Sequence, residues 1–440
     1  MTPDLDPERA VLGTLSLLPE LANNVANCNS LPFVQDPMTI SGAYQYAVWV
    51  SGALRVPLLA RRELPDGHWS RPIDLGAFPH SPFSDPTKLD PHHGYSLGVA
   101  ADGRLHLAGN CHNEPLRYAR SLPGDPTRWE TARMIGADEA RVTYPAFASL
   151  PDGTLLFFYR DGRAGSGDAY LNRLRPGAHD WERVGVVVEG RRSGESPYLN
   201  HVAVGRDGVL HLSGCFRGKG GAEHNRDVWH VCSSDAGTSW QDAGGAPLEA
   251  PLTHGAVPIV VPTASHGSGL VNQMGMDVDP AGHPHLAYLH YDAAGATQVA
   301  VASHDGGQWH RRDITSLTHR METRTPILDA SVARAAIACT ADGEVYAVFR
   351  ATRDGRRGRV TAIRCTPGSP LLEIPLYDGD LGTWEPAFDA HALRDRDELH
   401  LLLTAAPPYL PGAYGSVAAE WEECTIGVLS VSAAELADAR

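Results

Sequence analysis

The stretch from Pro151 to Arg160 reads PDGTLLFFYR, a turn followed by a short apolar strand. An Asp-Gly pair suits a hairpin turn because glycine accepts a positive φ, and the residues after it are apolar and β-favouring. The pattern recurs as SGALRVPLLAR from Ser51, ADGRLHLAG from Ala101, RDGVLHLSGCFR from Arg206, PAGHPHLAYLH from Pro280, ADGEVYAVFR from Ala341 and RDELHLLLT from Arg396. This repetition of a turn and a strand predicts an all-β repeat protein.

A second marker lies between the repeats, where a tryptophan closes a later strand. The sharpest example is SSDAGTSW, from Ser233 to Trp240, which matches the Asp-box pattern. We expect Asp235 to cap the backbone N–H groups of this turn and Trp240 to pack between blades. Together the markers predict a seven-bladed β-propeller with four-stranded antiparallel blades. One such domain would span residues 1–440, with an irregular lead-in over about 1–35 and a tail over about 430–440.

Composition and charge narrow the classes of partner. The 440 residues carry a net charge of −15 and no Lys/Arg-rich run, which disfavours nucleic acid and anionic membrane surfaces. An acidic ligand would therefore need a locally basic site. The seven cysteines form no CxxC pair, and acidic residues stand where a signal peptide needs positive charge. We expect reduced thiols, a cytoplasmic location and a monomer.

Histidine, tyrosine and arginine flank two neighbouring repeats, and a propeller gathers its functional residues at such strand ends. His92 precedes one predicted strand and His112 follows its hairpin partner, so the two imidazoles are expected at the same end of one blade. Tyr144 and Arg160 are placed in the same way in the next repeat. We expect the Arg160 guanidinium to lower the pKa of Tyr144 and make its phenolate usable as a base. The alternatives are satisfied core side chains and a surface ion pair.

Two further arginines and a possible metal site extend the set. Arg217 ends SGCFR and Arg324 lies in METRTPILD, and strand-end arginines can converge on a carboxylate, although each alone could be a solvated charge at the rim. His230 and Cys232 share one strand face and could help to hold zinc, but four ligands at suitable spacing are absent. A structural Ca²⁺ or Zn²⁺ is left open.

The stretches HHGYSLGVAADGRLHLAGNCHNEPLRYARS, VTYPAFASLPDGTLLFFYRDG and SSDAGTSW together resemble the BNR-repeat propellers that include ulvan lyases and rhamnosyl-glucuronate lyases. The resemblance extends from about Tyr44 to Trp421. It implies a catalytic cluster made of His92, His112, Tyr144 and Arg160.

The resemblance also implies substrate-binding residues. Arg217 and Arg324 match positions that hold the uronate in the rhamnosyl-glucuronate members. Two places depart from the family pattern: His93 stands where the family often has asparagine, and Asn110 replaces an aspartate near the second histidine. We count His93 and Asn110 among the expected binding residues, and it stays open whether His92 or His93 is the functional histidine.

The expected activity is β-elimination at O4 of a glucuronate in a rhamnose-uronate glycan, either ulvan-like or rhamnosyl-glucuronate. Arginines would neutralise the carboxylate, while Tyr144 or His112 takes the C5 proton and the other, or His92, protonates the leaving oxygen. This chemistry requires no cofactor, and the partner would be an acidic oligosaccharide or polysaccharide. Two alternatives remain: an α-L-rhamnosidase-type hydrolase with its histidine on the opposite face, and a non-catalytic glycan-binding propeller. A hydrolase usually needs two carboxylates, which this cluster lacks.

Overall fold

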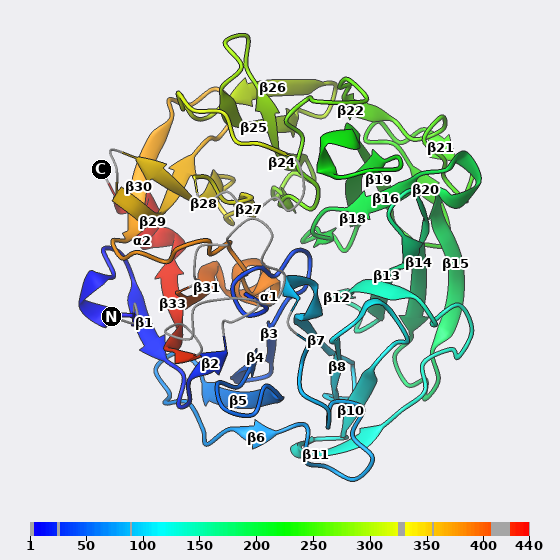
Figure 1. Cartoon of the computed structure of the whole chain (residues 1–440), viewed down its shortest axis with the longest axis vertical. Helices are drawn as coiled ribbons and strands as arrows, with labels where there is room; N and C mark the ends of the chain where they lie inside the picture. The colour runs from blue at the N-terminus through cyan, green and yellow to red at the C-terminus, as the bar shows by residue number, and fades with distance from the viewer. Residues whose placement is uncertain are drawn as a thin grey trace.

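The computed structural model describes residues 4–23, 27–88, 90–323, 331–353, 356–405 and 423–439. Its strands form antiparallel sheets arranged like blades around a central axis (Figure 1). The all-β propeller is therefore confirmed. Among the described residues no helix is both long and apolar enough to span a bilayer.

Six of the sheets contain four or more strands. In chain order they consist of β3 (Met38–Ser41), β4 (Tyr44–Val50), β5 (Pro57–Glu63) and β6 (Ile73–Asp74); β7 (Tyr95–Val99), β8 (Leu105–Gly109), β10 (Tyr118–Leu122) and β11 (Asp125–Thr131); β9 (His112–Glu114), β12 (Val142–Ser149), β13 (Leu155–Arg163), β14 (Ser166–Leu174) and β15 (Glu182–Glu189); β16 (Ser196–Leu199), β17 (Ala203–Val204), β18 (Leu210–Arg217), β19 (Asn225–Ser233), β20 (Trp240–Gln241), β21 (Pro247–Leu248) and β22 (Ile259–Val261); β23 (Met276–Val278), β24 (Pro284–Tyr291), β25 (Thr297–His304) and β26 (Trp309–Asp313); and β27 (Ala336–Cys339), β28 (Val345–Arg353), β29 (Arg356–Arg364) and β30 (Leu372–Tyr377).

A further sheet joins the two ends of the chain. It has three strands, in the order β1 (Thr14–Leu17), β33 (Ile426–Ser432) and β31 (Glu398–Thr404), and Phe388 adds a single bridge to Leu401 of β31. A two-stranded sheet of β2 (Ala22–Asn23) and β32 (Glu423–Cys424) lies beside it. Uniform four-stranded blades were thus the wrong expectation, because this sheet borrows a strand from the lead-in and two of the other sheets gain short extra strands, while four sheets have four strands each.

The lead-in is less irregular than its sequence suggests, since β1 pairs with the last strand of the chain. The tail contains the short helix α2 (Ala433–Asp438), which begins with a capping box formed by Ser432 and Glu435. The other helical segments are α1 (Ala390–Arg396) and four short 3₁₀ turns: η1 (Pro7–Arg9), η2 (Pro91–His93), η3 (Arg191–Ser193) and η4 (Ala222–His224).

Most of the predicted repeats correspond to one position in the sheets. Five of the seven copies contain the strand next to the innermost one, such as β8 and β13, whereas the copy from Ser51 contains β5, the third strand of its sheet, and the copy from Arg396 contains β31, the end strand of its sheet. The Asp-box forms as expected: Asp235 Oδ1 accepts the Ser239 N–H at 2.8 Å. Trp240 is buried in a cluster with side chains of the preceding sheet.

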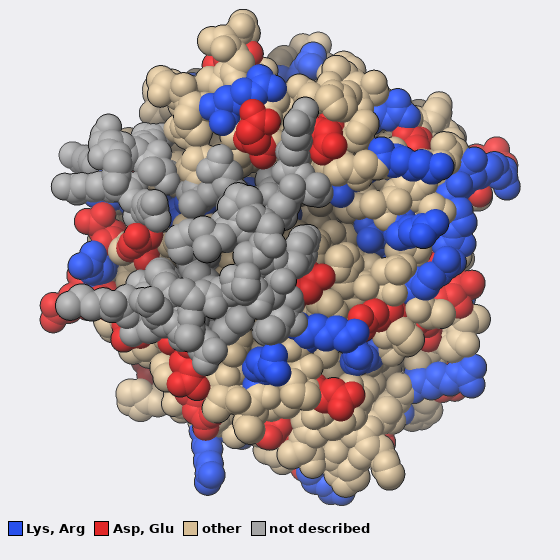
Figure 2. All heavy atoms as spheres, viewed as in Figure 1, with Lys and Arg blue, Asp and Glu red and all other residues tan. Residues whose placement is uncertain are grey.

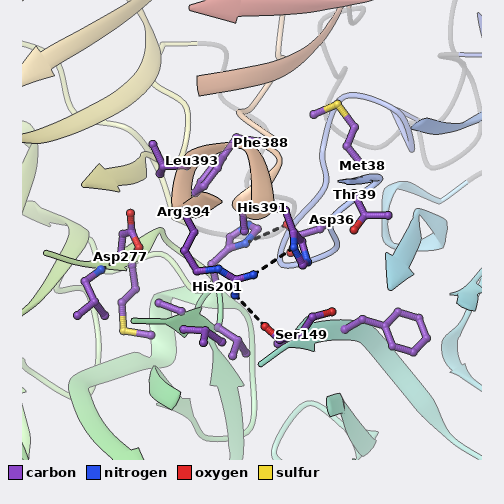
Figure 3. A pocket seen from close by; sticks show the side chains of 18 of the residues that line it. Asp36, Met38, Thr39, Ser149, His201, Asp277, Phe388, His391, Leu393 and Arg394 are labelled. Carbon is purple, nitrogen blue, oxygen red and sulfur yellow. Dashed lines mark hydrogen bonds and ion pairs between the residues drawn. The ribbon is translucent and has the colours of Figure 1, made fainter. Parts of the chain in front are cut away.

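The innermost strands converge on the axis and are held close together by small residues. A Cβ at Gly98 of β7 would lie 2.7 Å from the Cβ of Phe147 on β12, and a Cβ at Gly275 would lie 2.5 Å from the Cα of Ala336. Only glycine permits this approach between neighbouring sheets. A cavity of about 850 Å³ remains at the ends of these strands, and α1 covers it (Figure 3).

Side chains from the inner strands of several sheets line this axial cavity, among them Thr39, Ser149 and Asp277. Arg394 of α1 donates to the Ser149 carbonyl at 2.9 Å and so ties the helix to β12. Ser149 is the last residue of β12, whereas Tyr144 lies near its start. The predicted catalytic residues and this cavity therefore lie at opposite ends of the same strands.

Candidate functional site

The two predicted catalytic histidines meet at the starts of β7 and β12. Asp90 caps η2, with Pro91 as the first helical residue, and this turn presents His92. His112 is the first residue of β9, which pairs with β12 and belongs to the sheet that follows the sheet of β7. The ring centroids of His92 and His112 are 4.0 Å apart, with planes inclined by 20°. The sequence expectation that the imidazoles lie together is confirmed.

The Asp90 carboxylate bridges the Nδ1 atoms of the two imidazoles, and the sequence analysis did not identify this residue. His92 Nδ1 is 2.5 Å from Asp90 Oδ1, and His112 Nδ1 is 2.6 Å from Oδ2. In the sequence Asp90 directly precedes Pro91, and this pattern indicates only a turn. An Asp-Pro-His-His run could have identified it, because a capping aspartate reaches the side chain two residues ahead.

A β-bulge aims Tyr144 at the histidines. The pairing of β12 with β13 shifts register between Thr143 and Ala146, and Tyr144 has a φ of 59°. This left-handed conformation is strained for a bulky residue, and bulges often redirect side chains beside functional sites. The Tyr144 ring centroid lies 5.7 Å from that of His92.

Arg160 comes from β13 and lies between two tyrosine rings. Its Cζ is 5.1 Å from the ring centroid of Tyr144 and 4.8 Å from that of Tyr198. Its side chain lines a cavity of about 340 Å³ together with Tyr144. Only 5% of Arg160 is exposed, yet its Nε and Nη1 have no hydrogen-bond partner among the described residues. A buried guanidinium without an anion is costly unless a ligand supplies one.

Arg217 lies in the same region but is fully engaged within the protein. Its Nε donates to Asn225 Oδ1 at 2.6 Å, its Nη1 donates to the Tyr198 hydroxyl at 3.1 Å, and its Nη2 donates to Asn272 Oδ1. Its Cζ lies 4.1 Å from the ring centroid of Tyr198. In this state Arg217 positions Tyr198, which in turn packs on Arg160.

The remaining predicted binding residues differ in their surroundings. His93 is buried, and its Nε2 lies 3.9 Å from Glu114 Oε1. Asn110 is buried in the turn after β8, and its Oδ1 accepts the Lys88 N–H at 3.3 Å. Arg324 lies outside the described residues.

Three more side chains complete the cluster, and sequence reasoning named none of them. Phe33, from the lead-in, stacks on His92 with centroids 4.5 Å apart, and Arg334 Cζ lies 4.3 Å from the centroid of the Phe33 ring. Arg334 is itself paired with Glu385 at 2.6 Å. Tyr198 had a signal: it precedes Arg217 in its repeat much as Tyr144 precedes Arg160.

Burial sets the protonation of these groups. Burial raises the pKa of Tyr144 above its ordinary value, and the nearby Tyr198 adds to this, so the opposing arginines do not prevail. The expectation that Arg160 makes Tyr144 a ready phenolate is therefore wrong, because the cost of desolvating a phenolate exceeds the attraction of the guanidinium. Burial also lowers the pKa of His92 to about 4, against the opposing hydrogen bond of Asp90.

One cluster of the described residues has the side-chain types of a metal site. In the described part of the chain, one group of three or more His, Cys, Asp or Glu residues has its ligand atoms within 4.8 Å of one another, and it consists of Asp90, His92 and His112. His230 instead lies with its Nε2 3.1 Å from His211 Nδ1, and Cys232 Sγ contacts the Asp242 carbonyl. The zinc candidate from the sequence is not assembled by these two side chains.

The chain is acidic overall, but its basic residues are unevenly spread. Figure 2 shows Lys and Arg side chains gathered on the half of this face that lies over the sheets of β12–β15 and β16–β22. Arg163 and Arg191 belong to this region, since Arg163 ends β13 and Arg191 pairs with Asp161 beside Arg160. Basic side chains thus gather on part of this face despite the net charge of −15, and some of them, such as Arg191, are paired with aspartates.

Comparison with known proteins supports the sequence resemblance. The ulvan lyase of Nonlabens ulvanivorans is 22% identical over 329 residues, which cover 66% of this chain and 68% of the relative. A solved PL25 ulvan lyase bound to -[GlcA(1-4)Rha3S]- superposes with a TM-score of 0.71 at 17% identity, over 96% of this chain and 99% of that one. The polysaccharide lyase Uly1 gives a TM-score of 0.64 at 15% identity, over 90% of each chain.

These two structures share the propeller fold with this chain. The model of the BNR repeat-containing family matches residues 44–317, which is more than half of the sequence. This protein therefore belongs to the BNR repeat-containing family.

Proposed function

We propose that this protein is a polysaccharide lyase that cleaves at O4 of a glucuronate in a rhamnose-uronate glycan by β-elimination. The observation that carries the proposal is the buried Arg160, whose Nε and Nη1 are unpaired in the described structure and whose side chain lines a cavity together with Tyr144. A uronate carboxylate is anionic, so it would neutralise the guanidinium and accept hydrogen bonds from it.

The relatives support the choice of glycan. One is named an ulvan lyase, and another was solved with a glucuronate linked to a sulfated rhamnose.

Among the described residues, seven sheets of three or more strands also support our inference that the scaffold has seven blades, with the sheet of β1, β33 and β31 as the last.

The proposed reaction assigns a task to each side chain. An imidazole takes the C5 proton, the electron pair forms the C4–C5 double bond, and the C4–O4 bond breaks as Tyr144 donates its proton to O4. Arg160 stabilises the negative charge that develops on the carboxylate as the C5 proton leaves. Because burial raises the pKa of Tyr144 and lowers that of His92, the tyrosine suits the acid and the imidazole pair suits the base.

A product assay tests the proposal. The protein is incubated with ulvan and with a rhamnose-capped arabinogalactan, and the products are followed by ultraviolet absorbance and mass spectrometry. We expect a 4,5-unsaturated uronate, which absorbs because its double bond is conjugated with the carboxylate. Free rhamnose without absorbance would instead indicate the hydrolase, and glycan binding without any product would indicate the non-catalytic propeller.

Tyr144→Phe distinguishes turnover from binding. The substitution removes the proton donor but keeps the ring, so we expect kcat to fall by about 10²–10⁴-fold. The Kd for the glycan, measured by calorimetry, should change by less than about threefold. An unchanged kcat would contradict the role of Tyr144 as the acid.

A further inference from the structure

Asp90 makes one contact with each histidine of the cluster through a different oxygen. Oδ1 faces His92 Nδ1 at 2.5 Å, and Oδ2 faces His112 Nδ1 at 2.6 Å. The carboxylate is itself held by the backbone, because Oδ1 also accepts the His92 N–H at 2.9 Å. Both imidazoles therefore take their orientation from one fixed group.

The protonation of Asp90 determines which ring nitrogens carry hydrogen. Oδ1 of Asp90 accepts the His92 N–H, and each of its two oxygens faces a ring nitrogen, which is the arrangement of an ionised carboxylate. An ionised carboxylate has no proton to donate and can only accept hydrogen bonds. Each Nδ1 must then be the donor, and in a neutral imidazole this leaves the lone pair on Nε2.

The packing around the rings prevents them from turning. His92 is stacked between His112 and Phe33, with centroid distances of 4.0 Å and 4.5 Å. A ring flip would exchange the two nitrogens and break the contact with Asp90. Stacking thus holds the plane of the His92 ring, and the contact with Asp90 decides which ring nitrogen faces the carboxylate.

We propose that Asp90 is a positioning residue that holds His92 and His112 together as Nδ1–H tautomers, so that both Nε2 atoms are available as bases and Tyr144 is the proton donor. The tautomers follow from the contacts alone, whereas their use in elimination rests on the proposed function. When one Nε2 takes the C5 proton, the resulting imidazolium is stabilised by the negative charge of Asp90.

Nitrogen NMR of the protein with ¹⁵N-labelled histidine tests the tautomers directly. Long-range proton–nitrogen correlations distinguish Nδ1–H from Nε2–H rings, and His92→Gln and His112→Gln assign the two signals. We expect both rings as Nδ1–H. A signal of either residue in the Nε2–H form would overturn the proposal, whatever the activity of the protein.

Asp90→Asn tests the consequence for turnover. The carboxamide oxygen can accept from one imidazole only, while its NH₂ group forces the other to accept, so one ring should change tautomer. We expect kcat to fall by about 10²–10⁴-fold and KM to change by less than about threefold. A kcat within about threefold of the native value, or a loss confined to KM, would contradict the positioning role.

Asp279→Asn is the matched control, because Asp279 also lies between two histidines, His283 and His285, in a different sheet. We expect its kcat to remain within about twofold of the native value. Should Asp90→Asn fail to fold, the spectrum of the native protein still decides the tautomers.

The two proposals fail in different ways. Two Nδ1–H rings in a protein that forms no unsaturated product would overturn the lyase proposal and leave the role of Asp90 in holding the tautomers intact. Elimination by a protein with an Nε2–H ring would leave the lyase and overturn the positioning role.

Discussion

Asp90 and Asp279 each lie between two histidines, and the two clusters differ in how the carboxylate is used. Asp90 gives one oxygen to each imidazole, at 2.5 Å and 2.6 Å. Asp279 faces both rings with the same oxygen, at 3.3 Å to His283 Nδ1 and 3.5 Å to His285 Nε2. Its other oxygen accepts two backbone N–H groups of the turn between β23 and β24, each at 2.9 Å.

The surroundings separate the clusters further. Asp279 closes a hairpin turn, and His285 Nδ1 lies 2.8 Å from the Ser303 hydroxyl. Beside Asp90 lie a strained tyrosine and a buried, unpaired guanidinium. An aspartate with two histidines is therefore not a site by itself. In the proposed function, the neighbouring cation and hydroxyl let the first cluster bind and convert an anion, whereas the second cluster stabilises a turn.

The largest expected effect comes from removing the cation that distinguishes the two clusters. Arg160→Gln keeps hydrogen-bonding capacity but loses the charge, so we expect kcat/KM on the uronate glycan to fall by about 10³-fold. Arg160→Lys should fall less, by about 10²-fold, because a single ammonium replaces the two-pronged contact. Initial rates from ultraviolet absorbance give both values.

The stability of Arg160→Gln provides the control. Removing a buried charge that lacks a partner should leave the melting temperature unchanged or raise it. Arg173→Gln should do the opposite, since Arg173 is paired with Glu182 and donates to the Asp-box turn, for example to Thr238 at 2.9 Å. A loss of activity that merely follows a loss of stability in Arg160→Gln would make this arginine structural.

The fold could be predicted because its signal is local and repeated. Each turn with its alternating strand is contained in about ten residues, as in the copy from Pro151 that becomes β13. The closing strand β1 could not be found in this way. The segment from Thr14 to Leu17 pairs with β33 at the far end of the chain, and no local pattern encodes a partner at that distance.

The site was predictable to the extent that it follows the repeats. His92, His112 and Tyr144 lie at or near strand ends, Arg160 lies within β13, and the four are brought together. Phe33 comes from outside the repeats, so periodicity gave it no weight. The raised pKa of Tyr144 depends on burial by several sheets at once, which the sequence does not express.

A moderate effect is expected from His92, which should make the free energy of unfolding depend on pH in a different range from Asp279. Burial lowers the pKa of His92 to about 4, below its ordinary 6.5. Between these two pH values the unfolded chain binds a proton that the folded chain does not bind. The contribution of neutral His92 to the free energy of unfolding is therefore fully present above pH 6.5 and is lost as the pH falls towards 4. His92→Gln should remove about 1–2 kcal/mol of that loss, measured by urea unfolding at pH 7 and pH 4.5. An unchanged slope between these pH values would show that His92 is not held neutral.

The smallest effect is expected at Asp279, in a lower pH window. Desolvation opposes the shift, but hydrogen bonds from His285 and the His283 backbone lower the pKa of Asp279 to about 2. Its contribution is therefore present above pH 4 and is lost as the pH falls from about 4 towards 2. Asp279→Asn keeps the caps of the turn and loses only the screened charge, so we expect a cost of about 0.5 kcal/mol at pH 7 that disappears near pH 2. Urea midpoints at both pH values measure it, and a cost that persists at the lower pH would mean that the turn depends on the shape of the side chain and not on its charge.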